Sequence, residues 1–212
     1  MANHPSVPGS EPDRQSPRQD RLGRFELRRS LAESAAAQLW VAFDPRTAGE
    51  VRLKWMKLAQ GEPPESAALW VKAARSLNHL VHPSIVPVLD IDVVGGRPLL
   101  VSQWLAGPTI AAVLHDRHRL TATSAVDWMV QVLDALILAH ATGIVHGGIK
   151  AENVLIDPLD RARIMDFAVP MHLHGQPANA PVMDVGTDIQ AVGRLLADMV
   201  FGPGWADGQG SS

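Results

Sequence analysis

The chain has 212 residues, enough for one mid-sized domain or for two small lobes that share a core. Its composition is globular, with 46% hydrophobic and 19% charged residues and a formal net charge of -3. This balance is not basic enough to indicate nucleic acid or an anionic membrane as a partner. The lack of cysteine excludes disulfides and cysteine-ligated zinc.

The N-terminal segment shows no sign of a secretory signal, because no basic stretch followed by an apolar run occurs there. Residues 1–21 are rich in Pro, Ser, Gln and charge and are predicted to form a disordered arm. The longest apolar stretch, 129–145, is interrupted by polar residues and is too short to predict a membrane span. We therefore expect a soluble, cytoplasmic protein.

The first half of the chain has the alternation and turn residues of a β-rich lobe. Strands are predicted at 24–32, 37–43, 51–57, 85–94 and 98–103. Residues 66–80 carry apolar side chains at helical spacing. The face of this helix that is expected to be buried consists of Leu69, Ala73, Leu77 and Leu80.

The second half has mainly helical patterns. A short helix is predicted over 109–117, and a long one over 121–141 that Thr121 or Thr123 can cap. The expected buried face of the long helix is Val126, Met129, Val130, Leu133, Leu136, Ile137 and His140. A further helix is expected within 186–202, and residues 203–212 are predicted to be a flexible tail.

The stretch that indicates function begins at Ile144. It reads I-V-H-G-G-I-K-A-E-N-V-L-I-D, then a turn, then R-I-M-D-F-A. This order of loop, strand, turn and strand places Lys150, Asn153 and Asp166 at one mouth of a small hairpin. It resembles the H-R-D-x-K-x-x-N catalytic loop and D-F-G strand of eukaryotic-like serine/threonine protein kinases. Gly148 stands where that family has its catalytic Asp.

The resemblance covers 22–202 and implies an α+β, two-lobed protein-kinase-like fold. A small antiparallel β lobe is expected over 22–103, and a truncated, mainly helical large lobe over 104–202. The strand V-R-L-K resembles the V-A-I-K strand of the family. Lys54 thus takes the position of the phosphate-binding Lys.

Several parts that phosphoryl transfer needs are missing by this resemblance. Ala32, Ser34 and Ala37 take the three Gly positions of the glycine-rich loop, so an ordinary hairpin loop is expected. Ala73 stands where the Glu partner of the strand Lys should be. Asp166 is then the alternative partner for Lys54.

Other substitutions also argue against ordinary catalysis. Arg52 replaces a small Ala that lies against adenine, and a guanidinium there would fill or charge an apolar pocket. Gly147 replaces the Arg beside the catalytic Asp, and Ala168 replaces the Gly of D-F-G. The segment from Asp166 to Asp188 holds no clear A-P-E and is short for a substrate platform.

By contrast, the packing residues of the family are retained. The spine that links the two lobes would consist of Leu77, Val88, His146 and Phe167. His146 is expected to pack against Phe167 rather than to act in catalysis, and Asp188 is expected to anchor the loop from the last helix.

The sequence therefore predicts a pseudokinase, a catalytically impaired kinase-like domain that acts as a protein-binding or regulatory scaffold. No catalytic residue is expected, although Lys150 is retained. Lys54, Asn153 and Asp166 are predicted to be vestigial nucleotide-binding residues, and the last two vestigial Mg²⁺ ligands. No cofactor is required, and ATP and Mg²⁺ are expected to bind weakly at most.

A protein partner or a second copy is expected to bind an exposed surface of the large lobe, with no nucleic-acid or membrane partner. The apolar side chains expected to be partly open there are Ile189, Val192, Leu195, Leu196 and Met199.

Other interpretations remain open. The four retained polar residues allow a weakly active ATP-dependent serine/threonine kinase, and a remnant without function is also allowed. The H-G-G loop also resembles the H-G-D loop of small-molecule phosphotransferases such as aminoglycoside kinases, although Lys150 and the H-P-x-I-V segment favour the protein-kinase branch. A metal site built from His115, His118, His172 and His174 is a further alternative, but these residues lack nearby acidic ligands.

Overall fold

The structure is a computed structural model that describes residues 21–58, 61–63, 65–167 and 184–205. The predictions for residues 1–20, for Ala168, for His172 and His174 and for 206–212 lie outside these ranges. Arg21 was predicted to belong to the disordered arm, and that prediction is wrong. It begins β1 (Arg21–Leu22), where it pairs with Glu26 of the next strand.

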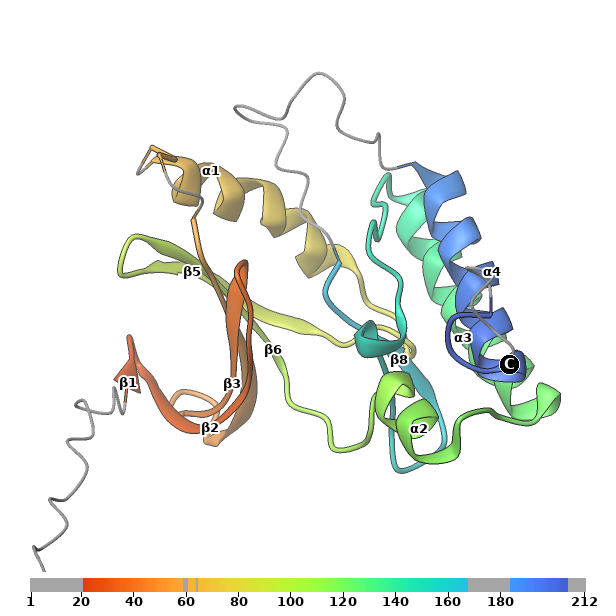
Figure 1. Ribbon diagram of the computed structural model, residues 1–212. Helices are drawn as coiled ribbons and strands as arrows, with labels where there is room; N and C mark the ends of the chain where they lie inside the picture. The colour runs from red at the N-terminus through yellow and green to blue at the C-terminus, as the bar shows by residue number, and fades with distance from the viewer. Residues whose placement is uncertain (1–20, 59–60, 64, 168–183, 206–212) are drawn as a thin grey trace, which may run out of the picture.

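A curled antiparallel sheet forms the small lobe (Figure 1). The strand order is β1-β2-β3-β4-β6-β5. Beyond β1, the strands are β2 (Phe25–Glu33), β3 (Ala37–Asp44), β4 (Gly49–Met56), β5 (Val88–Val94) and β6 (Arg97–Gln103). These confirm the predicted strands, apart from β1, whose length of 2 residues is too short for any alternation to be visible.

Helix α1 (Glu65–Ala74) lies against β5 and β6 and continues into the 3₁₀ helix η1 (Arg75–His79). The helix was predicted, and its expected buried face is right at Leu77 and Leu80, which are buried, but not within α1 itself. The residues that α1 buries are Ala67, Trp70, Val71 and Ala74, whereas Leu69 and Ala73 are only half-buried. The prediction failed at Leu69 and Ala73 because it continued the spacing of Leu77, which lies in the 3₁₀ helix, back into α1, although the tighter winding of a 3₁₀ helix changes the direction of the side chains.

The large lobe contains α2 (Ile110–Arg117), α3 (Ala122–Ala141), η2 (Ala151–Asn153), the hairpin β7 (Val154–Ile156) and β8 (Ala162–Ile164), and α4 (Val185–Phe201). Helices α3 and α4 lie side by side (Figure 1). Thr109 and Thr121 cap α2 and α3 by accepting a backbone N–H, and the cap at Thr121 is one of the two that the sequence predicted for α3. Residues 203–205 form a turn in which Trp205 stacks on Phe201.

The buried face of α3 differs from the predicted one. It consists of Ala125, Trp128, Met129, Val132, Ala135, Leu136 and Ala139. Val126, Val130 and Ile137 were expected inside, but they are 47%, 58% and 68% exposed. The alanines let α4 and β8 approach α3 closely, so the helix buries its small side chains and leaves larger ones outside.

The buried residues of α4 also differ from the prediction. Val192, Leu195 and Met199 were expected to be partly open, but they are buried in the core that includes the alanines of α3. Ile189 is exposed and Leu196 is half-buried, so the prediction holds for these two residues alone.

Among the described residues, α3 is the one helix long and apolar enough to span a membrane by length and composition. The sequence prediction missed this because it counted the apolar stretch from residue 129 rather than from the start of the helix. A core helix of a soluble protein passes the same test, so the observation carries little weight.

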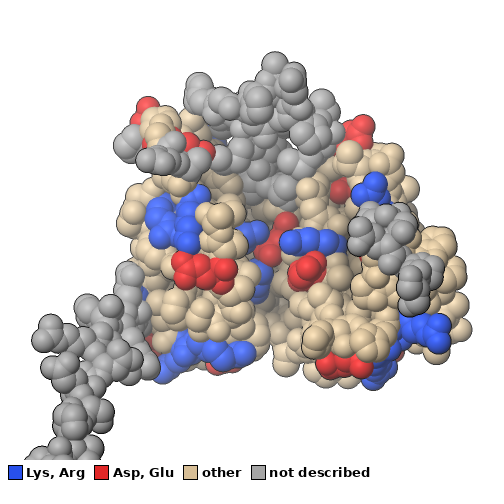
Figure 2. Space-filling model, viewed as in Figure 1, with Lys and Arg blue, Asp and Glu red and all other residues tan. Residues whose placement is uncertain are grey.

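Backbone hydrogen bonds connect the small lobe to the β7–β8 hairpin. Val86 N–H donates to the carbonyl of Ile164 at 2.9 Å, and Ile164 N–H donates to the carbonyl of Ser84 at 2.8 Å. The chain itself passes between the lobes after Gln103, where β6 ends. Figure 2 shows acidic and basic side chains interspersed on the visible face, including between the two lobes.

Candidate functional site

Asp188 of α4 anchors the loop between α3 and η2 by hydrogen bonds. This carboxylate is 1% exposed and accepts 2.8 Å hydrogen bonds from the backbone N–H groups of His146 and Gly147. The imidazole of His140 lies 2.8 Å from the same carboxylate. Gly147 adopts a φ of +66°, a left-handed conformation that glycine reaches without steric cost. Asp188 is therefore the anchor that the sequence predicted.

His146 has a packing role. Its ring is fully buried and lies 4.5 Å from the ring of Phe167, measured between centroids. Burial lowers the pKa of the His146 imidazole, and Nε2 lies 3.0 Å from the carbonyl of Met165. The neutral ring thus donates from Nε2 and fills the core, which confirms the predicted contact with Phe167.

Asn153 holds the loop at the position of the missing carboxylate. Its side-chain N–H donates to the carbonyl of Gly148 at 2.7 Å. The backbone carbonyl of Asn153 accepts from Met165 N–H at 3.0 Å. Gly148 has no side chain, yet a Cβ built there would meet only ordinary contacts, at 3.8 Å from Asn153 and 4.0 Å from His146. The fold thus tolerates a Cβ at the position where the sequence supplies no side chain.

Asp166 lies at the junction between the lobes, where two cations meet it. Arg52 from β4 forms two hydrogen bonds to the carboxylate, from Nη1 to Oδ1 at 2.8 Å and from Nη2 to Oδ2 at 2.7 Å. Lys54 Nζ lies 3.5 Å from Oδ1. The two cations share one face of β4 because they are two residues apart on a strand. The predicted Lys54–Asp166 pair is confirmed.

The charge of this cluster is stable. Burial by itself raises the pKa of Asp166, but the charges and hydrogen bonds of Arg52 and Lys54 lower it by more than burial raises it. The net result is a pKa well below the ordinary range of an aspartate, so the carboxylate is ionised at neutral pH. Its φ of +66° places this residue in a left-handed conformation that non-glycine residues rarely adopt.

Helix α1 contributes no carboxylate to this cluster. Ala73, at the position of the expected Glu, is half-buried and packs against the core. Among the ion pairs of the described residues, the partner of Lys54 is Asp166. The sequence did not predict the contact of Arg52 with Asp166. The position of Arg52, two residues before Lys54 on the same strand, could have indicated that both side chains lie on one face.

The β2–β3 hairpin loop is closed by its own hydrogen bonds. The Ser34 hydroxyl accepts from the backbone N–H groups of Ala36 at 3.2 Å and Ala37 at 3.1 Å. Ser34 N–H in turn donates to the carbonyl of Ala37 at 2.9 Å. Glu33 next to this loop pairs with Lys57 at 2.6 Å. This is the ordinary hairpin loop that the sequence predicted.

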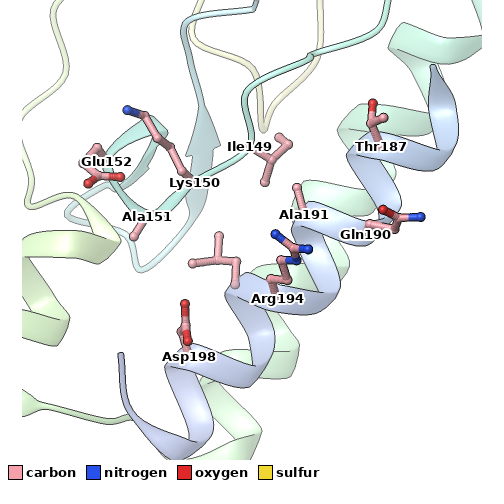
Figure 3. Close-up of a pocket in the computed structure, with 10 residues that line it drawn as sticks. Ile149, Lys150, Ala151, Glu152, Thr187, Gln190, Ala191, Arg194 and Asp198 are labelled. Carbon is pink, nitrogen blue, oxygen red and sulfur yellow. The ribbon is translucent and has the colours of Figure 1, made fainter. Parts of the chain in front are cut away.

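A groove of about 510 Å³ separates the loop 149–152 from one side of α4. Its charged lining consists of Lys150, Glu152, Arg194 and Asp198. Figure 3 shows the loop residues opposite the α4 residues across this groove. Lys150 is exposed, and the sequence prediction did not include the α4 side of the groove.

The metal alternative gains no support from the described residues, which contain no group of three His, Cys, Asp or Glu placed to hold an ion. His115 and His118 are exposed at the end of α2. His172 and His174 lie outside the described ranges.

The structure combines a lobe built on a curled sheet with a helical lobe. Between them, Asp166 and Phe167 follow β8, and Asp166 faces Lys54 of β4. This arrangement defines a protein kinase domain. The family model described as "Protein kinase domain" matches residues 33–202. The chain belongs to the protein kinase family, and the two-lobed α+β fold predicted from the sequence is confirmed.

Its relatives include bacterial serine/threonine kinases. The chain is 32% identical over 170 residues to serine/threonine-protein kinase PknA of Mycobacterium tuberculosis, covering 78% of this chain and 39% of PknA. It is 27% identical over 203 residues to a probable serine/threonine-protein kinase of Streptomyces coelicolor, covering 84% of this chain and 30% of that protein. The chain thus spans less than half the length of these relatives.

Solved structures agree on the fold. The kinase domain of Mycobacterium tuberculosis PknI matches with a TM-score of 0.71 and 22% identity, covering 85% of this chain and 75% of the PknI chain.

Proposed function

We propose that this chain is a catalytically impaired protein kinase domain, a pseudokinase, that acts by binding other proteins. The observation that carries the proposal is Gly148, which leaves the loop without a side chain where the family has its catalytic Asp. Loss of a general base alone typically reduces a rate by roughly 10²–10⁴-fold. Asn153, a predicted Mg²⁺ ligand, uses its side-chain N–H on the carbonyl of this same glycine at 2.7 Å.

The site also fits Mg²⁺-ATP poorly. A phosphate-binding loop needs free backbone N–H groups, but Ser34 takes up those of Ala36 and Ala37. Glu33, beside the same loop, holds Lys57 in an ion pair at 2.6 Å, so this lysine already has an anionic partner. At the other end of the cleft, both oxygens of Asp166 accept from Arg52. These contacts support a domain that requires neither ATP nor Mg²⁺ and binds them weakly at most.

The experiment is a transfer assay with purified protein, Mg²⁺, radiolabelled ATP and a generic protein substrate. We expect no transfer above the background of a Lys54→Met/Asp166→Asn variant. Gly148→Asp should fold normally, because a Cβ there meets no contact shorter than 3.8 Å. It should also remain inactive, since the other missing parts are not restored. Transfer that disappears on changing Lys54 or Asp166 would contradict the proposal.

A weakly active ATP-dependent serine/threonine kinase is the second candidate. The observation in its favour is that Lys54, Lys150, Asn153 and Asp166 are all present, with Lys54 and Asp166 3.5 Å apart. The kinase relatives fit this candidate equally well. The same assay decides between the two, and strong activity in Gly148→Asp would favour an enzyme that has lost one group.

The surface proposed for protein binding lies on the large lobe. Its exposed apolar side chains are Val126, Val130 and Ile137 of α3, Val185, Ile189 and Phe201 of α4, and Trp205. The number of exposed apolar side chains on these two packed helices supports the proposal of an interface with a second copy of the chain. A cytoplasmic location remains a prediction from the sequence.

Sedimentation at micromolar concentration tests the homodimer directly. We expect concentration-dependent association that Ile137→Asp abolishes. The matched control is Val81→Asp, which changes an 84% exposed apolar residue of the small lobe and should leave association intact. A folded protein that stays monomeric throughout would contradict the homodimer.

A further inference from the structure

Arg52 makes a contact between the lobes that is independent of any ligand. It reaches from β4 to Asp166, which follows β8, and the two residues are 114 positions apart in the chain. Their side chains are only 9% and 7% exposed. A two-bond guanidinium–carboxylate pair of this kind fixes both the distance and the orientation of its partners.

This pair engages both oxygens of the Asp166 carboxylate. Each oxygen of Asp166 accepts one hydrogen bond from Arg52, at 2.8 and 2.7 Å, and Lys54 supplies a second positive charge at 3.5 Å. Hard divalent cations bind carboxylate oxygens directly. A metal ion at Asp166 would therefore compete with the guanidinium for these oxygens and approach a site where two positive charges already face one carboxylate.

The neighbouring residues leave space for the long Arg52 side chain. Its cross-strand partners are Val41 on β3 and Ser102 on β6. Directly paired residues share a face of the sheet, so the small Ser102 lies beside Arg52 on the cleft side. Ser102 is 5% exposed and lines the small cavity next to Asp166. A larger side chain at Ser102 would compete with the guanidinium for this space.

We propose that Arg52 takes the place that a metal-bound nucleotide occupies between two lobes, as a built-in clamp. The Arg52–Asp166 pair holds the two lobes together and keeps divalent cations off the carboxylate. This inference does not rest on the proposed function. Phosphate transfer would contradict the pseudokinase, whereas a metal ion binding at Asp166 in the unaltered protein would contradict the clamp.

Thermal unfolding with and without Mg²⁺ or Mn²⁺, in the absence of nucleotide, tests the clamp. We expect the Tm of the unaltered protein to be insensitive to either ion. Arg52→Met keeps most of the length of the side chain and removes its charge. It should lower the Tm in metal-free buffer by about 5–15 °C, because it leaves the buried Asp166 with Lys54 alone.

The same variant should gain a rise in Tm with added metal, since an ion that binds only the folded state stabilises it. Arg28→Met is the matched control, because that arginine pairs with Glu26 on the surface and should change neither Tm nor metal response. The double variant Arg52→Met/Asp166→Asn removes both partners, so it should recover most of the lost Tm without a metal response.

Two results would overturn the clamp. One is a metal-dependent rise in the unaltered protein as large as that of Arg52→Met. The other is a Tm of Arg52→Met equal to that of Arg28→Met. If Arg52→Met does not fold, the Tm values of the double variant and of Arg52→Lys still test the clamp. A clamp predicts that Arg52→Lys has a Tm below that of the unaltered protein, because an ammonium cannot form the two parallel bonds. An unchanged Tm in Arg52→Lys would contradict the clamp.

Discussion

Asp188 in α4 accepts a 2.8 Å hydrogen bond from the backbone N–H of His146, which lies 42 residues earlier in the chain. Asp188 is 1% exposed, so this hydrogen bond is buried. An amide in place of this carboxylate would turn an N–H group toward another N–H donor. Asp188→Asn should therefore lower the free energy of unfolding by about 2–4 kcal/mol, measured by denaturant titration.

The control for this variant is Asp127→Asn on the exposed side of α3. A surface change of this kind should alter the free energy of unfolding by no more than about 0.5 kcal/mol. Equal effects of the two variants would show that the loop does not depend on Asp188.

Phe167 gives a second prediction, because it packs against His146 and is 7% exposed. Phe167→Ala removes a buried ring and should reduce the free energy of unfolding by about 3–5 kcal/mol. Val81→Ala is its control, since Val81 is 84% exposed and lies outside the surface proposed for association. If both variants unfold at the same denaturant concentration, the contact of the Phe167 ring with His146 contributes nothing measurable.

Asp157 closes the turn between β7 and β8 and gives a pH-dependent prediction. It accepts from Leu159 N–H at 2.9 Å and from the side chains of Arg161 and Arg163 at 2.9 and 3.1 Å. Burial alone raises the pKa of Asp157, but these hydrogen bonds outweigh it and lower the pKa to about 2. A carboxyl whose pKa is lower in the folded state than in the unfolded state stabilises the fold. This stabilisation is complete at pH values above the unfolded-state pKa of about 3.9.

Asp157→Asn should therefore destabilise the protein by about 2 kcal/mol at neutral pH. The difference between the two proteins should shrink as the pH falls from about 4 toward about 2, since protonation of the unfolded chain removes the advantage of the carboxylate. Urea titrations at several pH values measure this difference. A gap that stays constant across the series would refute the assignment.

Gly107 crosses directly over the end of β7. It has a φ of +142°, and an added Cβ would clash with the carbonyl oxygen of Ile156. Gly107→Ala should destabilise the protein by about 3 kcal/mol or more, because backbone on both sides must move. Gly143→Ala, at a φ of +77° with nothing near the added Cβ, should lose only the about 1–2 kcal/mol of a left-handed alanine. Similar losses for the two alanines, measured by denaturant titration, would contradict the clash.

The order of the strands and helices was predictable because turn residues and caps punctuate the chain. Thr109 and Thr121 mark two helix starts, and Gly95-Gly96 joins β5 to β6, with φ of +59° and +72°. These signals act over a few residues, so the sequence alone contains them. The contact of His146 with Phe167 followed from the resemblance to kinases rather than from local pattern.

Helix faces were harder to predict because they depend on what packs against them. On α3 the pattern of large apolar residues pointed to Val130 and Ile137, whereas the partner helix selects the side with Ala135 and Ala139. The Arg52–Asp166 pair was missed for a related reason. The sequence indicated a charge in the cleft, but which anion neutralises it depends on a contact between residues 114 positions apart.

The lobes meet along the chain after Gln103 and again where Val86 and Ile164 share a 2.9 Å hydrogen bond. The Arg52–Asp166 pair adds a third connection between the sheet and the helices. The three connections differ in kind, since one is covalent, one is a backbone hydrogen bond and one is a buried ion pair, so a condition that weakens one of them leaves the other two in place.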